Sequence, residues 1–452
     1  MCGFVGILNY NNDDFHFLEK ASKSIAHRGP DDDFNYLLKE ERLALYFRRL
    51  SIIDTSKNGR QPMLSNSKRF LIVFNGEIYN HKTLKKKYLN QNDYLVGKSD
   101  TEILLSIIEK YDLEFALKII EGMFSMVIWD NKFKKLFFTV DQNGEKPLYY
   151  YKTNNKIYFA SELKAITKFK NNPLIIDKKS LNYYFKYGFI PSPLTIYKNI
   201  YKLMPGDFFS YDKKLKKINY KILTNDDTSI ISQDDNYYVN KLDTLLNESV
   251  EKMSFANVPI GSFLSGGTDS SLISAILQSQ STKKIDTFSI INDDPRYDES
   301  EYSSGIAKCL QTNHYAMKIS KKDHVDFFEK SHELFCEPFS DSSQIPVYVL
   351  SKFTKKKVKA VLSGDGADEL FGGYNRYIYF NNALKWKYFF KVSKLDKILN
   401  LISPYQYDNI FNILKNISSN SNIANFGEKF TKLLNSTDAD NPKNFFRDLI
   451  SI

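Results

Sequence analysis

The chain has 452 residues, which exceeds a usual single domain and predicts two or three domains. Hydrophobic residues make up 42% of it and charged residues 26%, a composition typical of a globular protein with sizeable cores. The net charge is +10, yet the lysines are spread along the whole chain and no aromatic-basic motif accompanies them. This pattern argues against a nucleic-acid partner.

The sequence also argues against a membrane partner. No apolar run approaches the roughly 18 residues of a membrane-spanning helix, and MCGFVGILNYNND lacks the basic flank of a signal peptide. The three cysteines, Cys2, Cys309 and Cys336, are too scattered for a disulfide framework or a zinc site. We therefore expect a cytoplasmic protein.

The first half of the chain reads as short apolar strands broken by turns, with a few helical segments. This grouping predicts a layered α+β domain. The predicted strands are residues 2–8, 43–53, 70–74, 124–129, 135–140, 148–151 and 157–160, and the predicted helices are 15–26, 101–111 and 114–121.

The pattern changes after a polar stretch at residues 224–236, which reads as a linker. From there strands alternate with helices, which predicts a parallel sheet. The predicted elements are a helix at 239–253, a strand at 260–264, a helix from near Ser270, a strand at 287–291, a helix at 301–310, strands at 315–319 and 358–362, and a helix at 369–380.

Cys2 follows the initiator methionine, whose removal would leave a thiol and an α-amine on one residue. Their reference pKa values, about 8.5 and about 7.7–8.0, allow the amine to take the thiol proton near neutral pH. Cys2 is therefore a candidate nucleophile with its own general base. The alternative is a small apolar residue at the start of a buried strand.

Several motifs accompany this cysteine: HRGPD at 27–31, RLSIID at 49–54, NGEIYN at 75–80, SDTE at 99–102 and FASELKA at 159–165. Together with MCGFVGI they resemble the glutaminase domain of class II glutamine amidotransferases. The resemblance implies the four-layer sandwich of N-terminal nucleophile hydrolases, with Cys2 as the nucleophile.

By position, the resemblance also implies the glutamine pocket. Arg49 would bind the α-carboxylate of glutamine and Asp100 its α-ammonium, while Asn75 and the N–H of Gly76 would form the oxyanion hole. The pocket would be completed by Ile52, Ile53 and Glu77. The alternatives are a surface ion pair for Arg49 and a charge at a helix N-terminus for Asp100.

A second motif, LSGGTDSS at 264–271, lies between a predicted strand and a predicted helix. Its glycines allow a tight turn, and its serines and the helix N-terminus supply donors to phosphate oxygens. Asp269 could hold the magnesium that such phosphates bring. The alternative is a Gly-Gly turn that caps the helix, and no Walker lysine follows.

This motif resembles the PP-loop of ATP pyrophosphatases. With TFSI at 287–290, EPFSDSSQIP at 337–346 and LSGDGADELFGGYNRY at 362–377, it resembles the synthetase domain of glutamine-hydrolysing asparagine synthetases. The resemblance implies an α/β parallel-sheet domain that converts ATP, aspartate, glutamine and water into AMP, pyrophosphate, asparagine and glutamate. Asp365 would serve formation of the acyl-adenylate, and Asp368 and Glu369 would line the magnesium and acceptor pocket; the alternative is ordinary helix N-terminal charge. The implied ATP-binding residues are Leu264, Ser265, Gly266, Gly267, Asp269, Ser270, Ile290, Ser363 and Gly364.

We therefore predict a glutaminase domain at 1–210, a linker at 211–236 and an asparagine synthetase-like domain at 237–452.

The chain departs from the family pattern at four positions, Phe47, Val140, Gln142 and Thr268. Family members usually continue past the point matching Ile452, so we expect a truncated synthetase domain. The alternatives left open are another carboxylate acceptor, a glutaminase without synthetase activity, and a non-catalytic binding protein. A homodimer is the predicted oligomer.

Overall fold

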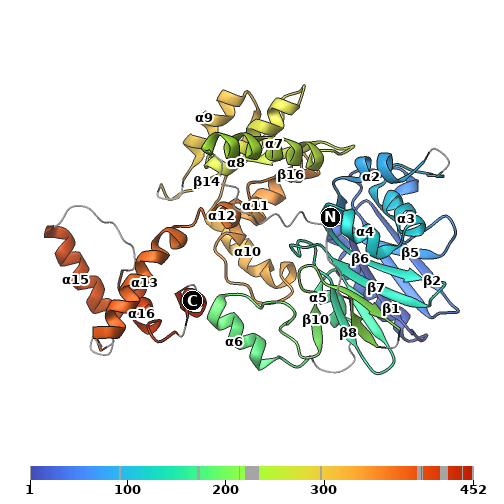
Figure 1. Cartoon of the computed structure of the whole chain (residues 1–452), viewed down its shortest axis with the longest axis horizontal. Coiled ribbons are helices and arrows are strands. Elements are labelled where there is room, and N and C mark those ends of the chain that lie inside the picture. Colours follow the sequence, from blue (N-terminus) through green and yellow to red (C-terminus); the bar gives the residue numbers. More distant parts are fainter. Residues whose placement is uncertain are drawn as a thin grey trace. The chain divides into compact units, whose positions relative to one another are not determined.

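A computed structural model of the chain describes residues 2–90, 93–169, 174–212, 214–218, 234–295, 298–393, 399, 401–417, 426–439 and 441–449 (Figure 1). The chain divides into two compact units. The first comprises Met1–Tyr184 and Phe189–Ser363, and the second comprises Phe185–Gly188 and Gly364–Ile452.

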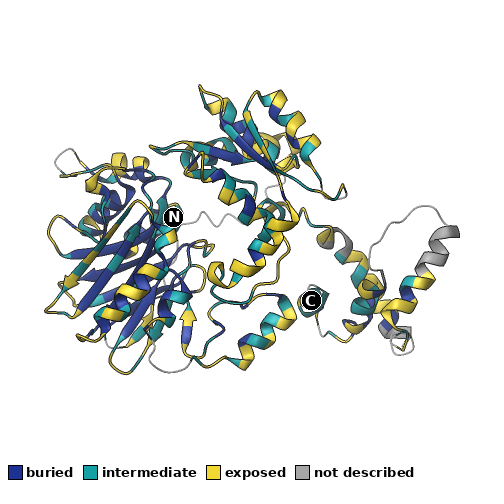
Figure 2. Cartoon of the chain, turned by 180° about the vertical axis from the view of Figure 1, so that it is seen from behind, coloured by how far each residue is buried: buried dark blue, intermediate teal, exposed yellow. Residues whose placement is uncertain are grey.

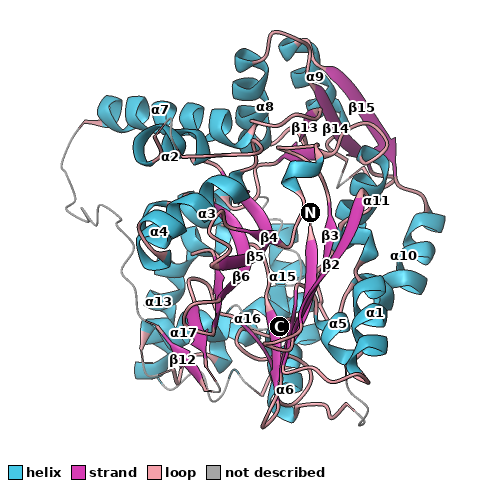
Figure 3. Ribbon diagram, turned by 90° about the vertical axis from the view of Figure 1, so that its right-hand side faces the viewer, coloured by secondary structure: helices cyan, strands magenta, loops and turns pink. Residues whose placement is uncertain are grey.

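Two six-stranded antiparallel sheets form the N-terminal part of the first unit. Figure 3 shows their strands in magenta. The first sheet has the order β10 (Ile200–Lys202), β8 (Tyr149–Lys152), β9 (Ile157–Ala160), β1 (Gly3–Leu8), β3 (Leu43–Arg49) and β2 (Asp32–Leu38). The second has the order β12 (Leu215–Lys217), β11 (Phe208–Tyr211), β7 (Lys135–Val140), β6 (Gly122–Asp130), β5 (Phe70–Ile78) and β4 (Met63–Leu64).

Alternating side chains join these sheets into a sandwich. Phe4 and Leu8 of β1 belong to a core that also contains Leu71 and Val73 of β5, so this core lies between the two sheets. The residues between them along each strand face the other way, as the period of two in a strand requires. Most of the dark-blue buried residues of this part lie on the strands (Figure 2).

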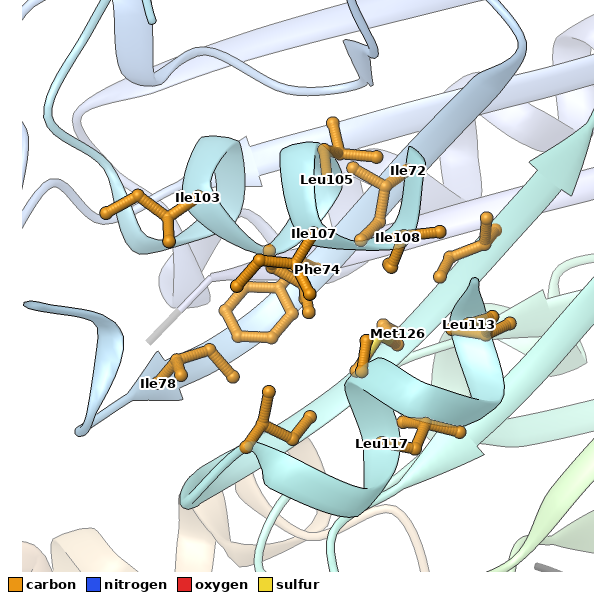
Figure 4. Close-up of a cluster of buried hydrophobic side chains, with 14 of the residues drawn as sticks. Ile72, Phe74, Ile78, Ile103, Leu105, Ile107, Ile108, Leu113, Leu117 and Met126 are labelled. Atoms are coloured by element: carbon orange, nitrogen blue, oxygen red, sulfur yellow. The ribbon is translucent and has the colours of Figure 1, made fainter. Parts of the chain in front are cut away.

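Helices cover both outer faces. On the first sheet, the core that includes Val5 and Ile7 also contains residues of α1 (Asp14–Ser24) and α5 (Leu163–Thr167). On the second, Ile72 and Phe74 pack against α3 (Asp100–Lys110) and α4 (Leu113–Ile119), as Figure 4 shows; α2 (His81–Tyr88) contributes Leu84 to the same core. The order helix, sheet, sheet, helix is the predicted four-layer sandwich.

A four-stranded parallel sheet forms the rest of the first unit, as predicted. Its order is β15 (Asn313–Lys318), β14 (Asp286–Ile291), β13 (Ile260–Phe263) and β16 (Ala360–Leu362). The helices of this part are α7 (Asp235–Met253), α8 (Thr268–Gln280), α9 (Ser300–Leu310), α10 (Lys321–Leu334) and α11 (Gln344–Thr354).

The second unit is helical. Residues Phe390, Tyr407 and Leu434 form its buried core. Its helices are α12 (Ala367–Phe371), α13 (Asn375–Ser393), α15 (Pro404–Ile417), α16 (Phe426–Asn435) and α17 (Pro442–Leu449), and helix α6 (Lys178–Tyr187) enters it with its last residues.

Several element predictions need correction. The strand predicted to reach residue 53 ends at Arg49, where the chain enters a loop. The single helix predicted at 369–380 is two helices, because Gly372 adopts a φ of +69° and ends α12. Helix α8 begins at Thr268 rather than near Ser270.

The described part of the predicted linker includes β12, and residues 219–233 lie outside the described residues. The domain boundaries therefore stay a prediction.

Candidate functional site

Cys2 lies directly before β1, opposite the end of β3, because Gly3 pairs with Arg48 in the antiparallel register. The chain leaves β3 after Arg49 into a loop, residues 49–54. Leu50 of this loop contacts the thiol with both backbone groups: its N–H donates to Sγ at 3.4 Å, and Sγ donates to its carbonyl oxygen at 3.6 Å. The loop backbone thus fixes the direction of the sulfur.

Burial raises the pKa of the Cys2 thiol. The hydrogen bond from Leu50, the positive N-terminus and the charge of Arg49 oppose this effect, whereas the charge of Asp100 adds to it. The charges of two predicted glutamine-binding residues therefore both act on the thiol. A neutral thiol at rest needs a base, which is the role predicted for the α-amine.

Arg49 is buried and its guanidinium holds the loop. One terminal nitrogen donates to the carbonyl oxygen of Ser56 at 2.8 Å, and the other donates to that of Asp54. Each of these nitrogens carries two N–H groups, so one on each is left to match a carboxylate. This arrangement suits the predicted contact with the α-carboxylate of glutamine.

Asp100 is also buried, in the first turn of α3. Its carboxylate accepts hydrogen bonds from the backbone N–H groups of Ile78, at 2.9 Å, and Thr101, at 2.8 Å. Burial nevertheless raises its pKa, with these hydrogen bonds acting against it. The charge of His81 also acts against burial, but no ion pair to Asp100 occurs among the described residues, so this buried carboxylate is suited to an incoming ammonium group.

Asn75 and Gly76 lie next to each other on β5, opposite Ser125 and Phe124 of β6. The Asn75 side chain is fully buried; its Nδ2 lies 3.5 Å from Ser125 Oγ, and its Oδ1 has no hydrogen-bond partner among the described residues. A Cβ at Gly76 would lie 2.0 Å from the carbonyl oxygen of Met123, so only glycine fits. The Nδ2 group carries two N–H donors and the contact with Ser125 uses one of them, so the other can donate to an oxyanion, in agreement with the predicted oxyanion hole.

Glu77 and the loop isoleucines complete the predicted pocket. Burial, with the nearby charge of Asp100, raises the pKa of Glu77 to about 7, and Lys146 acts in the opposite direction. Ile53 is buried, and the carbonyl oxygen of Ile52 accepts a hydrogen bond from the N–H of Asn257 at 3.0 Å.

Three residues near the thiol received no role from the sequence alone. Arg28 donates from Nε to the carbonyl oxygen of Cys2 at 2.9 Å and from Nη1 to Glu162 at 2.9 Å. Glu162 also accepts from His27, and these partners lower its pKa to about 2 against the effect of burial. All three belong to the motifs HRGPD and FASELKA, so their presence there was the available signal.

The PP-loop follows β13 and closes on itself through its serines. Ser265 Oγ and Ser270 Oγ are 2.9 Å apart, and Ser265 Oγ accepts from the N–H of Gly267 at 3.3 Å. Gly266 adopts a φ of +98°, which favours glycine. Gly267 caps helix α8, and Asp269 is exposed in its first turn. The described loop thus presents hydroxyl groups and the N-terminus of α8, a helix of thirteen residues.

Other predicted nucleotide residues lie at the same edge of the sheet. Leu264 donates its N–H to the carbonyl oxygen of Phe288 at 2.9 Å, and Ile290 is two residues further along β14. Ser363 follows β16, which pairs with β13 in parallel. In open α/β sheets, ligands bind at the carboxyl ends of the strands.

Gly364, Asp365, Asp368 and Glu369 belong to the second unit. There Glu369 accepts a hydrogen bond from the Tyr374 hydroxyl at 2.6 Å, and the carbonyl oxygen of Asp368 accepts from the N–H of Gly373 at 3.0 Å. The roles of these residues stay predictions.

The side chains that could coordinate magnesium are few. Among the described residues, no three His, Cys, Asp or Glu side chains form a group that could hold a metal ion. Asp269, which is exposed beside the PP-loop, carries an oxygen ligand of the kind magnesium prefers. It fits a cation that is held mainly by phosphate oxygens.

The departures from the family pattern leave the thiol pocket intact. Phe47 and Val140 are buried in the core between the two sheets. Asp141, next to Val140, accepts hydrogen bonds from the backbone N–H groups of Phe124 and Lys146 and so fixes a turn. Thr268 is the first residue of α8.

Comparison with known proteins agrees with this architecture. Residues 1–221 match the family model described as a glutamine amidotransferase domain, and residues 241–449 match the model described as asparagine synthase. The chain belongs to the glutamine-hydrolysing asparagine synthetase family.

Individual relatives show the extent of this similarity. The chain is 35% identical over 382 residues to asparagine synthetase [glutamine-hydrolyzing] 1 of Bacillus subtilis, covering 83% of this chain and 59% of that protein. It is 34% identical over 431 residues to the protein named "Putative asparagine synthetase [glutamine-hydrolyzing] 2" of Methanocaldococcus jannaschii, covering 90% of this chain and 82% of that protein. With Escherichia coli asparagine synthetase B the identity is 26% over 426 residues, covering 90% and 70%. The chain therefore spans about three fifths of the length of the Bacillus relative.

The membrane prediction can be compared with the helices themselves. None of the described helices combines the length and the apolar character that crossing a membrane requires.

Proposed function

We propose that this protein amidates aspartate to asparagine, using ATP and ammonia released from glutamine through a β-aspartyl-AMP intermediate. The observation that carries the proposal is the thiol pocket: Cys2 bonded to Leu50, with the charges of Arg49 and Asp100 acting on its sulfur. A PP-loop on the same chain supplies the second half of the chemistry.

The first reaction would occur at Cys2. Once Met1 is removed, the α-amine takes the thiol proton, and the sulfur attacks the side-chain carbonyl carbon of glutamine. Asn75 Nδ2 and the N–H of Gly76 stabilise the oxyanion of the tetrahedral intermediate. The intermediate collapses to a thioester, and the amine returns the proton to the leaving nitrogen as ammonia. Water then hydrolyses the thioester to glutamate.

The second reaction would use the PP-loop. The β-carboxylate of aspartate attacks the α-phosphorus of ATP, and pyrophosphate leaves toward the serines of the loop and the N-terminus of α8. Ammonia then attacks the acyl carbon and displaces AMP. Adenylation is necessary because a carboxylate oxygen is a poor leaving group. Magnesium would neutralise phosphate charge, with Asp269 as a candidate ligand. The motif supports roles for Asp365, Asp368 and Glu369 in this step.

A direct assay tests the proposal. Purified protein with ATP, magnesium, aspartate and glutamine should release pyrophosphate and form asparagine in equal amounts. Pyrophosphate release with another carboxylate acceptor but not with aspartate would identify a different amidotransferase. Ammonia from glutamine without any ATP turnover would identify a glutaminase, and neither activity would leave a binding protein.

Cys2→Ala separates the two halves. It should abolish glutamine-dependent synthesis while synthesis from added ammonium salt persists. If Cys2→Ala retained glutamine-dependent synthesis, the assignment of the nucleophile would be wrong. The proposed cytoplasmic location and homodimer can be checked by fractionation and by the molar mass in solution.

A further inference from the structure

The loop of residues 49–54, which holds the thiol, is bonded at two neighbouring positions to the part of the chain that carries the PP-loop. At the first position, the N–H of Ser51 donates to Asp31 Oδ2 at 2.9 Å, and Lys359 Nζ donates to the same oxygen at 2.7 Å. At the second, the N–H of Asn257 donates to the carbonyl oxygen of Ile52 at 3.0 Å.

Asp31 is hydrogen-bonded to this loop through its backbone N–H and through its carboxylate. Its own N–H donates to the carbonyl oxygen of Arg49 at 3.0 Å, while its carboxylate accepts from Ser51. Leu50, between these two residues, makes both hydrogen bonds to Cys2 Sγ. A displacement of Asp31 would therefore displace the backbone that orients the thiol.

Lys359 and Asn257 lie close to the amino ends of two adjacent strands. Lys359 directly precedes β16, and Asn257 comes three residues before β13. These strands pair in parallel from Ile260 and Ala360 onward, and the N–H of Lys359 donates to the carbonyl oxygen of Pro259 at 3.3 Å. The two anchors therefore belong to one small hydrogen-bonded element.

The carboxyl ends of the same two strands lead into the proposed nucleotide site. The PP-loop begins after β13, and Ser363 follows β16. The strands have four and three residues, so each spans only about 10–13 Å at roughly 3.3 Å per residue. The path from phosphate loop to thiol loop is thus short and continuous through hydrogen bonds.

The ion pair is poorly placed to act mainly as a source of stability. The Lys359 side chain is 40% exposed and that of Asp31 is 27% exposed, and exposed ion pairs contribute little to folding. Its distinguishing feature is that the shared oxygen also accepts the hydrogen bond from Ser51.

We propose that Lys359 and Asp31 are positioning residues that couple nucleotide binding at the PP-loop to glutamine binding at Cys2. This inference rests on the proposed function. Ordering of the PP-loop by nucleotide fixes the ends of β13 and β16, and Lys359 transmits this to the loop of residues 49–54 through Asp31. The loop carries Arg49, so glutamine binds more tightly when nucleotide is bound.

The test uses Cys2→Ala protein, which can bind glutamine without hydrolysing it. Calorimetry gives the Kd of glutamine with and without ATP and magnesium, and the Kd of ATP with and without glutamine. Aspartate is left out so that ATP is not consumed. Binding linkage requires that ATP lower the Kd of glutamine by the same factor by which glutamine lowers the Kd of ATP. We expect this coupling factor to be about fivefold or more.

Three further variants in the Cys2→Ala background test whether Lys359 transmits the coupling. Lys359→Met should reduce the factor to about one while changing the Kd of glutamine alone by less than about twofold, because the loop keeps its bonds to Asp31. Lys359→Arg keeps the charge and should restore most of the coupling. Lys252→Met is the matched control: Lys252 pairs with Glu121 at 2.8 Å, also between the two halves, but reaches no residue of the loop. It should keep the full factor.

Each outcome is decisive. ATP binding with no effect on glutamine affinity would overturn the inference and leave the proposed function standing. Absence of ATP binding would overturn both. Full coupling in Lys359→Met, in protein whose thermal unfolding is unchanged, would remove the assignment to this residue.

Discussion

Arg28 donates from Nε to the backbone oxygen of Cys2 at 2.9 Å, so the residue before β1 is held from its carbonyl as well as from its sulfur. The other end of the same guanidinium donates to Glu162 at 2.9 Å. The Arg28 and Glu162 side chains are only 11% and 10% exposed, so this ion pair is desolvated and its geometry matters.

Arg28→Met should therefore destabilise the protein and impair glutamine hydrolysis. Breaking a buried pair usually costs about 3–5 kcal/mol, and we expect a value near the lower end, since His27 and Lys164 still contact Glu162. Urea unfolding measures the loss. The double variant Arg28→Met/Glu162→Gln also removes the buried charge that has lost its Arg28 partner and should recover part of the loss. Equal stability of both variants would contradict a desolvated pair.

Asn75→Ala should lower kcat for glutamine hydrolysis by about 10²–10³, the usual effect of removing one oxyanion donor. The KM for glutamine should change little, because this contact strengthens in the transition state. Ser125→Ala is the control, since Ser125 Oγ contacts the Asn75 amide at 3.5 Å but has no predicted contact with the oxyanion. A KM effect without a kcat effect would instead place Asn75 in ground-state binding.

Gly76→Ala should distort the strand pair that carries the second oxyanion donor. The added Cβ would lie 2.0 Å from the carbonyl oxygen of Met123, and such overpacking costs about 1–3 kcal/mol. Gly305→Ala offers a matched contrast, because nothing lies within 4 Å of its Cβ on helix α9. That variant should gain about 0.5–1 kcal/mol of stability. Denaturant unfolding of both proteins distinguishes a steric effect from a general intolerance of glycine substitution.

Glu77 should make stability fall as the pH rises. Its pKa is raised from 4.5 to about 7 in the folded protein, so between these values the folded state binds a proton that the unfolded state has released. The contribution is present below about pH 4.5 and is lost as the pH passes 7, at most on the order of 3 kcal/mol. The difference in unfolding free energy between Glu77→Gln and the parent should therefore change between pH 5 and pH 8. A constant difference would show that Glu77 does not titrate there.

Much of the fold follows from local sequence pattern. The strands at 135–140 and 157–160 were predicted with the bounds that the structure shows, because short apolar runs between turns mark them clearly. β2 and α2 were not predicted. β2 is half exposed along its length and α2 contains four lysines, so neither shows a strong apolar period.

The thiol pocket was only partly predictable. Motif residues such as Arg49 and Asp100 could be named because the resemblance assigns roles to their side chains. Leu50 could not, since it acts through its backbone, and no side-chain pattern reveals a hydrogen bond to a sulfur 48 residues away. Glu162 is 134 residues from Arg28, so its role depends on the pairing of β1 with β9, which only the fold provides.

Gly266→Ala tests the PP-loop independently of the thiol. Gly266 has a φ of +98°, and an added Cβ would lie 2.7 Å from the Tyr302 Cβ and 2.8 Å from the Ser303 nitrogen. Such strain is worth about 1–3 kcal/mol, so the loop should open and the Kd for ATP should rise by about tenfold or more. Gly267→Ala is milder, because its Cβ would meet only Ser265 Oγ at 3.5 Å. Calorimetric titration with ATP and magnesium should rank the two variants in this order, while glutamine hydrolysis without nucleotide stays at the parent level. Equal ATP affinity in Gly266→Ala and the parent would mean that nucleotide does not bind at this turn.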